Sequence, residues 1–293
     1  MDLKEYMAAK NHLIENCLEK LLTKELEIPI MVESMKYSVF AGGKRLRPIL
    51  AIMTCELFDG SIEEVLPLSC CIELIHTYSL IHDDLPSMDN DDFRRGKPTN
   101  HKVFGTGFAV LAGDALLNIA YEIMLEHIFK FSKPEYIKAA YVISKAAGVT
   151  GMVGGQYIDL YYENKDITLD RLIQMHDKKT GAMIKASLET GAIIANAKID
   201  DIERITHYGQ LIGRAFQITD DILDVKGSKE KLGKTLGKDA NNNKSTYVTY
   251  FGLERSNEIA LDSVNKAKEI ISVYGSKAKL LYELADYIVN RDS

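Results

Sequence analysis

Two groups of three aspartates are the residues in this chain best suited to metal chemistry. Each group lies in a segment that otherwise has the pattern of a buried helix, and carboxylates are rarely buried unless they are paired or bind a metal. The pattern predicts a cavity with two facing acidic walls that hold divalent cations, suited to diphosphate ester chemistry because several Lys and Arg are nearby. The two groups are Asp83, Asp84 and Asp89, and Asp220, Asp221 and Asp224.

The second group has the simpler geometry. Gln217, Asp220, Asp221 and Asp224 are spaced i, i+3, i+4 and i+7, which places them on one stripe of a helix. Three carboxylates on one stripe repel one another unless a cation bridges them. A solvated acidic face is the alternative, but no Lys or Arg is interleaved to pair with it, so a metal site is favoured.

The first group lies at the end of a predicted helix. His76 and Asp83 are seven residues apart and share a face, and Pro86 ends the helix because its ring disrupts the hydrogen-bond ladder. Asp89 is therefore expected in a turn rather than on the face of Asp83, and a turn of this kind can return it toward the same metal. Arg94 and Arg95 follow, and guanidinium groups bind phosphate oxygens with two bonds; the alternative is that they neutralise the acidic loop.

The carboxylate ligand set predicts magnesium. Mg²⁺ prefers oxygen donors and binds through one or two carboxylates together with substrate phosphates and water. No Cys and His set favours zinc, and the spacing of the four cysteines indicates small core residues in a reduced compartment.

Further basic and polar side chains lie in short motifs that are weak signals singly. They gain weight because they occur together with the two aspartate groups, and helix starts that carry Lys and Arg favour anions. The motifs are GGKRLRP with Lys44 and Arg47, HDKKTG with Lys179 and Thr180, GKTLGKD with Lys234, and KST with Lys244.

The elements that must position these residues are predicted to be helices. Apolar periodicity recurs every three to four residues along the chain, and alternation typical of strands is not convincing anywhere. A polar loop is expected over 226–246, and the simplest organisation is one all-α domain over residues 1–293. The predicted helices cover 2–26, 30–41, 45–58, 63–84, 107–129, 134–150, 168–194, 201–223, 255–273 and 276–290.

Composition limits the partners. The chain has 293 residues, 46% of them hydrophobic, and a formal net charge of -6. That charge argues against nucleic acid and anionic membrane surfaces as partners. The N-terminal segment lacks a secretory signal, and no uncharged apolar stretch reaches about 18 residues. A cytoplasmic protein without a membrane span is expected.

In these motifs the chain resembles the bacterial-type short-chain trans-polyprenyl diphosphate synthases, most closely the farnesyl diphosphate synthases. The resemblance rests on DDLPSMD and DDILD, together with GGKRLRP, HTYSLIHDD, RRGKPTNH, HDKKTG, FQITDDILD and the GKTLGKD and KST motifs, in the order of that family. It spans roughly residues 35 to 250. The paired aspartate motifs followed by RRG are its most specific part.

The resemblance implies a fold, a reaction and an assembly. The fold would be a single large helical bundle around a central cavity, and the assembly a homodimer. Isopentenyl diphosphate would be joined head-to-tail to dimethylallyl and then geranyl diphosphate, giving farnesyl diphosphate and releasing diphosphate. Three Mg²⁺ ions would serve each site, with Mn²⁺ as a substitute.

The resemblance also implies roles for single residues. Asp83, Asp84, Asp89 and Asp220 would hold magnesium against the allylic diphosphate, with Asp221 and Asp224 in support. Tyr78, with Ser79 beside it, would form the floor that sets product length. The allylic diphosphate would be bound by Arg94, Lys179, Thr180, Gln217, Lys234 and Lys244, and isopentenyl diphosphate by Lys44, Arg47, His76 and Arg95.

Other enzymes remain as alternatives. A geranylgeranyl diphosphate synthase would use the same residues with a deeper cavity. An HD-type metal phosphohydrolase would use His76, His82 and Asp83, but it would leave the second aspartate group without a role. A terpene cyclase would not need the second diphosphate site formed by Lys44, Arg47 and His76.

Overall fold

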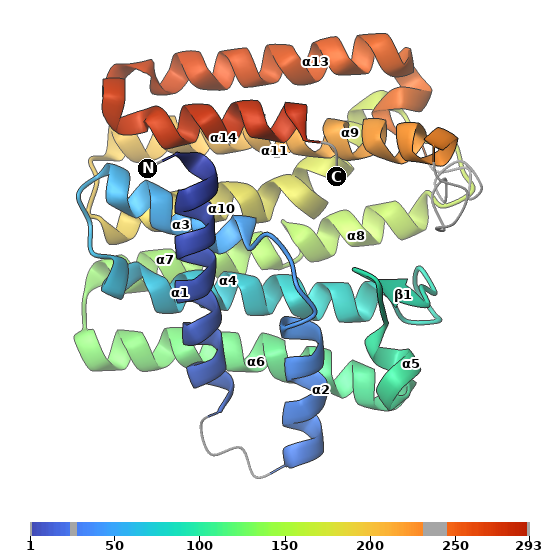
Figure 1. Cartoon of the computed structure of the whole chain (residues 1–293), viewed down its shortest axis with the longest axis horizontal. Helices are drawn as coiled ribbons and strands as arrows, with labels where there is room; N and C mark the ends of the chain where they lie inside the picture. The colour runs from blue at the N-terminus through green and yellow to red at the C-terminus, as the bar shows by residue number, and fades with distance from the viewer. Residues whose placement is uncertain (1, 24–27, 231–244, 292–293) are drawn as a thin grey trace. The chain divides into compact units, whose positions relative to one another are not determined.

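The computed structural model describes residues 2–23, 28–230 and 245–291, without the side chains of 228–230. These residues are almost entirely helical, which confirms the predicted all-α class (Figure 1). In order, the elements are α1 (Leu3–Leu22), α2 (Pro29–Val39), α3 (Leu46–Leu57), α4 (Ile62–Asp83), β1 (Phe93–Arg94), β2 (Lys97–Pro98), α5 (Asn100–Phe104), α6 (Thr106–Phe131), α7 (Pro134–Ala147), α8 (Met152–Tyr161), α9 (Leu169–His176), the π-helix η1 (Asp177–Gly181), α10 (Ala182–Ile194), α11 (Ile199–Glu230), α13 (Tyr247–Ile271), the 3₁₀-helix η2 (Ser272–Ala278) and α14 (Lys279–Asn290).

The chain divides into two compact units, and each carries one aspartate group. The first unit comprises Met1–Tyr141 with Ile193–Asn196, and the second comprises Val142–Ala192 with Ala197–Ser293. The single domain over 1–293 and its central cavity stay predictions.

In the first unit the core is built on α4. This helix is apolar on nearly all sides, as is typical of a helix surrounded by others, and it packs against α3 and α6 (Figure 1). Its one buried acid, Glu73, accepts a 2.8 Å bond from Arg45, which is itself buried. This ion pair fixes the start of α3 and with it the GGKRLRP segment.

Two helices of the first unit, α4 and α6, are long and apolar enough to cross a membrane by length and composition alone. The apolar window of α4 is 67% buried, as expected of a core helix, whereas that of α6 is 39% buried. The difference reflects exposed apolar side chains on α6, among them Phe108, Leu111, Leu125 and Phe129.

In the second unit the longest element is α11, which packs against α13 and α14 (Figure 1). Two glycines of this unit allow helices to approach η1 closely. A Cβ added at Gly155 of α8 would lie 2.2 Å from the backbone nitrogen of Lys179, and one at Gly213 of α11 would lie 2.9 Å from Cα of Gly181. The π-helix η1 is therefore held closely by α8 and α11.

Several predicted boundaries were wrong. The predicted helix 168–194 is interrupted by η1, and α11 continues to Glu230, into the expected loop. The predicted start at 255 is wrong because Thr246 caps α13, accepting a bond from the nitrogen of Thr249; Gly252, with φ 75°, kinks the helix inside. The remainder of the expected loop, 231–244, lies outside the described residues.

Three short elements were missed: α5, α8 and the β1–β2 hairpin. The hairpin pairs Phe93 with Pro98 and Arg94 with Lys97. Its two loop residues, Arg95 and Gly96, have φ of 53° and 76°. Positive φ at both loop positions suits a tight turn whose twist matches that of the paired strands.

Candidate active site

The end of α4 brings the first aspartate group together through its backbone. The helix ends at Asp83, before Pro86, as predicted. The following turn folds back, because the amide of Asp89 donates to the carbonyl of Asp83 at 2.9 Å and that of Asn90 donates to Leu85 at 3.1 Å. Asp89 thus lies in a turn anchored to the residue that ends the helix.

Within this group, Asp84 differs from its neighbours. It is 3% exposed, and both of its oxygens accept bonds from Nε of Arg94, at 2.8 and 2.9 Å. Burial raises the pKa of Asp84, although Arg94 opposes the shift. Burial also acts to lower the pKa of Arg94, but its bonds to Asp84 raise the pKa overall. The contact thus joins a buried carboxylate to a guanidinium that is 33% exposed.

Arg94 and Arg95 are adjacent in sequence but point to different partners. Arg94 binds Asp84, whereas Arg95 donates to the carbonyl of Gly42. The contact is close: a Cβ added at Gly43, where φ is 130°, would lie 2.6 Å from a terminal nitrogen of Arg95. The hairpin turn therefore directs Arg95 to the GGKRLRP segment, where its guanidinium bonds the backbone.

The positive charges of several arginines act on His76. Burial lowers the pKa of His76 well below its usual value, and the positive charges of Arg47, Arg95, Arg94 and Arg45 lower it further. His76 is thus neutral at pH 7 and sits in a strongly cationic region. Such a region favours anions. The predicted residues Arg47, His76 and Arg95 are therefore brought together, whereas Lys44 is exposed beside them.

Tyr78 and Ser79 lie one turn before the first aspartates. Tyr78 is 6% exposed and its ring meets that of His82 edge-on, with 5.6 Å between centroids. Burial, with smaller effects of Tyr121 and Asp83, raises the pKa of Tyr78 to about 12. The hydroxyl of Ser79 donates to the carbonyl of His76 at 2.8 Å. Tyr78 is thus a buried side chain held by its neighbours rather than a surface side chain.

The second aspartate group is built around Asp221, which is 4% exposed. One oxygen accepts from the side-chain amide of Gln217 at 2.9 Å, and the other accepts from the backbone nitrogen of Tyr247 at 2.9 Å. Asp221 therefore joins α11 to the start of α13. Like Asp84, it is the second aspartate of its DD pair and uses both oxygens inside the protein.

The motif HDKKTG forms η1, and its two predicted residues have different partners. Thr180 donates to the side-chain oxygen of Gln217 at 2.7 Å, extending the chain of bonds to Asp221. Lys179 pairs with Asp159 of α8 at 2.6 Å. π-Helical turns frequently occur at functional sites. Here the wider turn directs the side chain of Thr180 toward α11 and that of Lys179 toward α8.

Asp220 is the half-exposed member of the second group. Its side chain is 44% exposed, and one oxygen accepts a bond from Arg291, which follows α14. Asp224 lies one turn further along α11 and is also partly exposed. Lys234 and Lys244 lie outside the described residues.

One candidate was not among the predicted site residues. Gln156, on α8 directly after Gly155, has both side-chain amide atoms buried without a hydrogen-bond partner. Buried polar atoms are rarely left unsatisfied, so this amide suits a ligand atom. The polar interruption GGQ was its only sequence signal.

The donor chemistry fits a divalent cation that shares its ligands with a substrate. In the described part of the chain, no three acidic, His or Cys side chains form a cluster able to hold a metal unaided. That is compatible with Mg²⁺, which usually needs only one or two carboxylates because phosphates and water complete its shell. Asp84 and Asp221 already use both oxygens, so the partly exposed Asp83, Asp89, Asp220 and Asp224 fit best.

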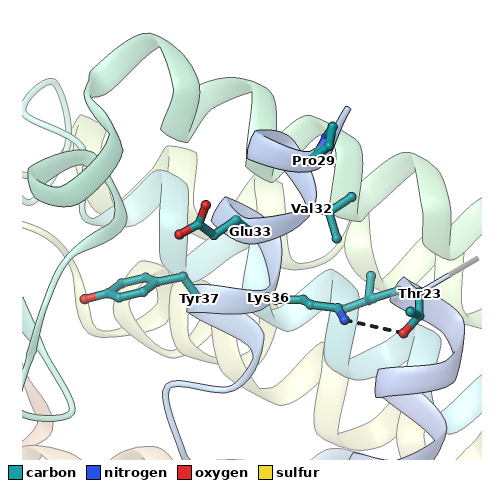
Figure 2. Close-up of a pocket in the computed structure, with 7 residues that line it drawn as sticks. Thr23, Pro29, Val32, Glu33, Lys36 and Tyr37 are labelled. Atoms are coloured by element: carbon teal, nitrogen blue, oxygen red, sulfur yellow. Dashed lines mark hydrogen bonds between the residues drawn. The ribbon is translucent and has the colours of Figure 1, made fainter. Parts of the chain in front are cut away.

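Two pockets of the first unit differ in whether predicted site residues line them. A pocket of about 590 Å³ lies between the end of α1 and α2, where Lys36 reaches Thr23 at 3.4 Å (Figure 2). None of the predicted site residues lines it. A cavity of about 30 Å³ is lined by Asp84, Arg94 and Arg95, among others, and has room for about one water molecule.

Comparison with known proteins identifies similar enzymes along the whole chain. Residues 28–284 match the sequence model of the polyprenyl synthetase family. A geranylgeranyl diphosphate synthase of Cyanophora paradoxa is 44% identical, covering 100% of this chain and 97% of its own. A farnesyl diphosphate synthase of Bacillus subtilis is 43% identical, covering 99% and 98%.

Solved structures agree with the sequence matches. An FPP/GFPP synthase from Zymomonas mobilis superimposes with a TM-score of 0.87 at 39% identity, covering 98% of each chain. A geranyltransferase from Legionella pneumophila gives a TM-score of 0.89 at 33% identity, covering 99% of this chain and 97% of its own.

Proposed function

Because the chain belongs to the polyprenyl synthetase family and is a prenyltransferase, we propose that it joins isopentenyl diphosphate head-to-tail to dimethylallyl and then geranyl diphosphate, releasing diphosphate and giving farnesyl diphosphate. The observation that carries the proposal is the shared construction of the two aspartate groups. In each, the second aspartate is buried and bonded at both oxygens, which fixes partly exposed carboxylates beside it. The family excludes the HD-type phosphohydrolase.

The divalent cations would be held by Asp83, Asp89, Asp220 and Asp224. Asp84 and Asp221 would fix the positions of these four carboxylates through their own hydrogen bonds. We infer Mg²⁺, three per site, with Mn²⁺ as a substitute. When bound, the metal would offset charge that develops on the departing diphosphate.

The allylic diphosphate would be held by cationic and polar side chains. Positively charged donors aimed at its oxygens stabilise the negative charge of the leaving group. Lys179 and Arg94 are already oriented by Asp159 and Asp84, so they need little rearrangement. The full set is Arg94, Lys179, Thr180, Gln217, Lys234 and Lys244.

Isopentenyl diphosphate would bind the cationic region of the first unit. Lys44, Arg47 and Arg95 would pair with its phosphates, while neutral His76 would donate a hydrogen bond without adding charge. Its double bond attacks the allylic carbon as the carbon–oxygen bond breaks. The proton then lost passes to the released diphosphate.

Thr180 and Gln217 would steady the allylic cation. Thr180 donates to Gln217, and Gln217 donates to Asp221, so the oxygen of Thr180 keeps its acceptor capacity. This chain of bonds fixes both oxygen dipoles before the substrate arrives. Pre-oriented dipoles avoid a reorganisation cost during the reaction.

The metal assignment is tested with Asp83→Asn and Asp220→Asn. Each variant should lose at least about 100-fold in condensation rate with dimethylallyl and isopentenyl diphosphates. Asp92→Asn is the control, because the Asp92 carboxylate forms an exposed pair with Lys102 at 3.0 Å and lies outside both groups. Near-parental turnover in both site variants would refute the metal role.

A geranylgeranyl product is the second candidate, favoured by the similarity to the Cyanophora paradoxa enzyme. We infer that Tyr78, with Ser79 beside it, limits the chain to fifteen carbons, since Tyr78 is bulky and buried one to two turns before the first aspartates. Sizing the dephosphorylated alcohols distinguishes the two products. Tyr78→Ala should lengthen the product whereas Tyr78→Phe should not, and an unchanged Tyr78→Ala product would remove this residue as the floor.

We also infer a cytoplasmic homodimer of single-domain subunits. The support is α6, where two pairs of apolar side chains, Phe108 with Leu111 and Leu125 with Phe129, are at least half exposed in the single chain. Exposed apolar groups of this kind often mark interfaces. A second copy of the same helix would bury them.

A further inference from the structure

Arg291 is placed by the packing of α14. This helix ends at Asn290, and Arg291 follows in extended conformation with φ −71° and ψ 147°. The hydroxyl of Tyr208 on α11 donates to the carbonyl of Leu281 at 2.8 Å, and both residues are buried. The helix is therefore fixed along α11, and its last turn delivers Arg291 to the second aspartate group.

The contacts of Arg291 form a built site rather than a loose surface pair. Its guanidinium carbon lies 3.9 Å from the ring centre of Phe216. One terminal nitrogen donates to the carbonyl of Phe216 at 3.2 Å and to Oδ1 of Asp220. The Arg291 side chain is only 7% exposed, although Asp220 is 44% exposed. Stacking on an aromatic face and bonding to a backbone carbonyl both orient the guanidinium.

This contact differs from the other carboxylate contacts of the two groups. Asp84 and Asp221 are almost completely buried, and their partners form part of the packing. Asp220 is open to solvent on one side while Arg291 covers its Oδ1 oxygen. A guanidinium and a divalent cation repel each other strongly when both are in contact with one carboxylate oxygen.

We propose that Arg291 competes with the divalent metal for Asp220 and so sets the metal concentration at which the second aspartate group is occupied. This inference rests on the proposed function, because it takes Asp220 as a metal ligand. Binding of the metal with diphosphate moves Arg291 off Oδ1, while Phe216 keeps the side chain nearby. Arg291 acts as a positioning residue through Asp220.

The test measures metal affinity directly. Free Mn²⁺ is counted by electron paramagnetic resonance during titration of the protein with Mn²⁺ and inorganic diphosphate. Arg291→Gln should bind Mn²⁺ at least about tenfold more tightly, the size expected from removing one hydrogen bond to a charged group. Arg291→Lys keeps the charge but loses the planar group, and it should fall between the two.

The control is Arg255→Gln, which removes an exposed arginine of α13 that pairs with Glu258 at 2.6 Å. Its Mn²⁺ affinity should equal that of the parent protein. Thermal unfolding without metal gives a second measurement: Arg291→Gln should melt at a lower temperature than Arg255→Gln, because it loses a buried contact.

Asp220→Asn separates the two proposals. If it weakens Mn²⁺ binding while Arg291→Gln leaves the affinity unchanged or weaker, competition by Arg291 is overturned and the metal role of Asp220 stands. If Asp220→Asn does not weaken Mn²⁺ binding, the metal role itself is overturned and the competition with it.

Discussion

At the scale of single residues, the two aspartate groups contain carboxylates of two kinds. The sequence alone does not distinguish the two aspartates of each DD pair. The structure distinguishes them, because Asp84 and Asp221 use both oxygens for protein donors, whereas Asp83 and Asp220 are partly exposed. The predicted metal roles of Asp84 and Asp221 stay predictions, and a metal on either would have to replace contacts that the protein already makes.

Removing the carboxylate of Asp84 should destabilise the fold. Asp84→Asn leaves Arg94 without its charged partner, and we expect a loss of about 2 kcal/mol in the free energy of unfolding, reduced from the value for a fully buried pair because Arg94 is one-third exposed. Urea unfolding measures it. Asp92→Asn, which breaks an exposed pair with Lys102, should change stability by less than about 0.5 kcal/mol. Equal effects of the two variants would contradict the structural role of Asp84.

His176 should make stability depend on pH. It is 7% exposed and its ring lies 5.4 Å from that of Tyr247. Burial lowers its pKa to about 4, helped by Lys179 and opposed by Asp159. Because the unfolded chain binds this proton below pH 6.5 and the folded protein does not, the stabilisation is complete above pH 6.5 and is lost as the pH falls toward 4.

Between pH 7 and pH 5 this linkage should cost the folded protein about 2 kcal/mol. Urea unfolding of the parent protein and of His176→Gln at both pH values isolates the contribution, since other groups titrate alike in both. The variant should lose about 2 kcal/mol less than the parent over this interval. Parallel losses would show that His176 does not resist protonation in the fold.

At the scale of elements, the second unit depends on close helix approach around η1. Gly155 of α8 and Gly213 of α11 allow the backbone of η1 to lie against both helices. The π turn then presents Thr180 to Gln217 and Lys179 to Asp159. A side chain at either glycine would therefore disturb packing and the candidate site together.

Gly155→Ala tests this arrangement. The added Cβ would lie 2.2 Å from the nitrogen and 2.6 Å from Cα of Lys179, so the backbone must move. We expect a loss of about 2–3 kcal/mol in unfolding free energy and a clear drop in condensation rate. Gly107→Ala is the matched control, since a Cβ there meets nothing within 4 Å and alanine favours the helix. A harmless Gly155→Ala would mean that α8 and η1 do not need this contact.

At the scale of the whole molecule, the exposed apolar side chains of α6 are the strongest signal of assembly. Phe129 is 86% exposed, an unusual position for a phenylalanine, and Phe108, Leu111 and Leu125 of the same helix are each at least half exposed. The helix is apolar enough to resemble a membrane span, yet less than half of its apolar window is buried in one chain. Self-association would account for both properties.

Phe129→Asp should convert the proposed dimer to monomers, because two buried carboxylates would face each other across a two-fold interface. Sedimentation should change from a species near 66 kDa, twice the 32.8 kDa of one chain, to one near 33 kDa. Ile199→Asp replaces an apolar residue that is 66% exposed on the second unit and should leave the mass unchanged. A monomeric parent protein would remove the proposal.

The sequence by itself determined the helical class, the family and the position of most helices, because apolar periodicity and the order of short motifs are local properties of the chain. It also placed the end of α4 before Pro86. Local pattern failed where an element depends on a distant partner. The π turn at 177–181 and α8 exist because glycines let three segments approach closely, and GGQ in isolation looks like an interruption.

Only the tertiary structure decided which aspartates are buried and hydrogen-bonded at both oxygens, because that depends on Arg94, Gln217 and the nitrogen of Tyr247. It alone brought Arg291 to Asp220, 71 residues away in sequence. The physical reason is common to both cases. Spacing fixes which side chains share a helix face, but desolvation and hydrogen-bond partners come from other helices, and those determine what each carboxylate does.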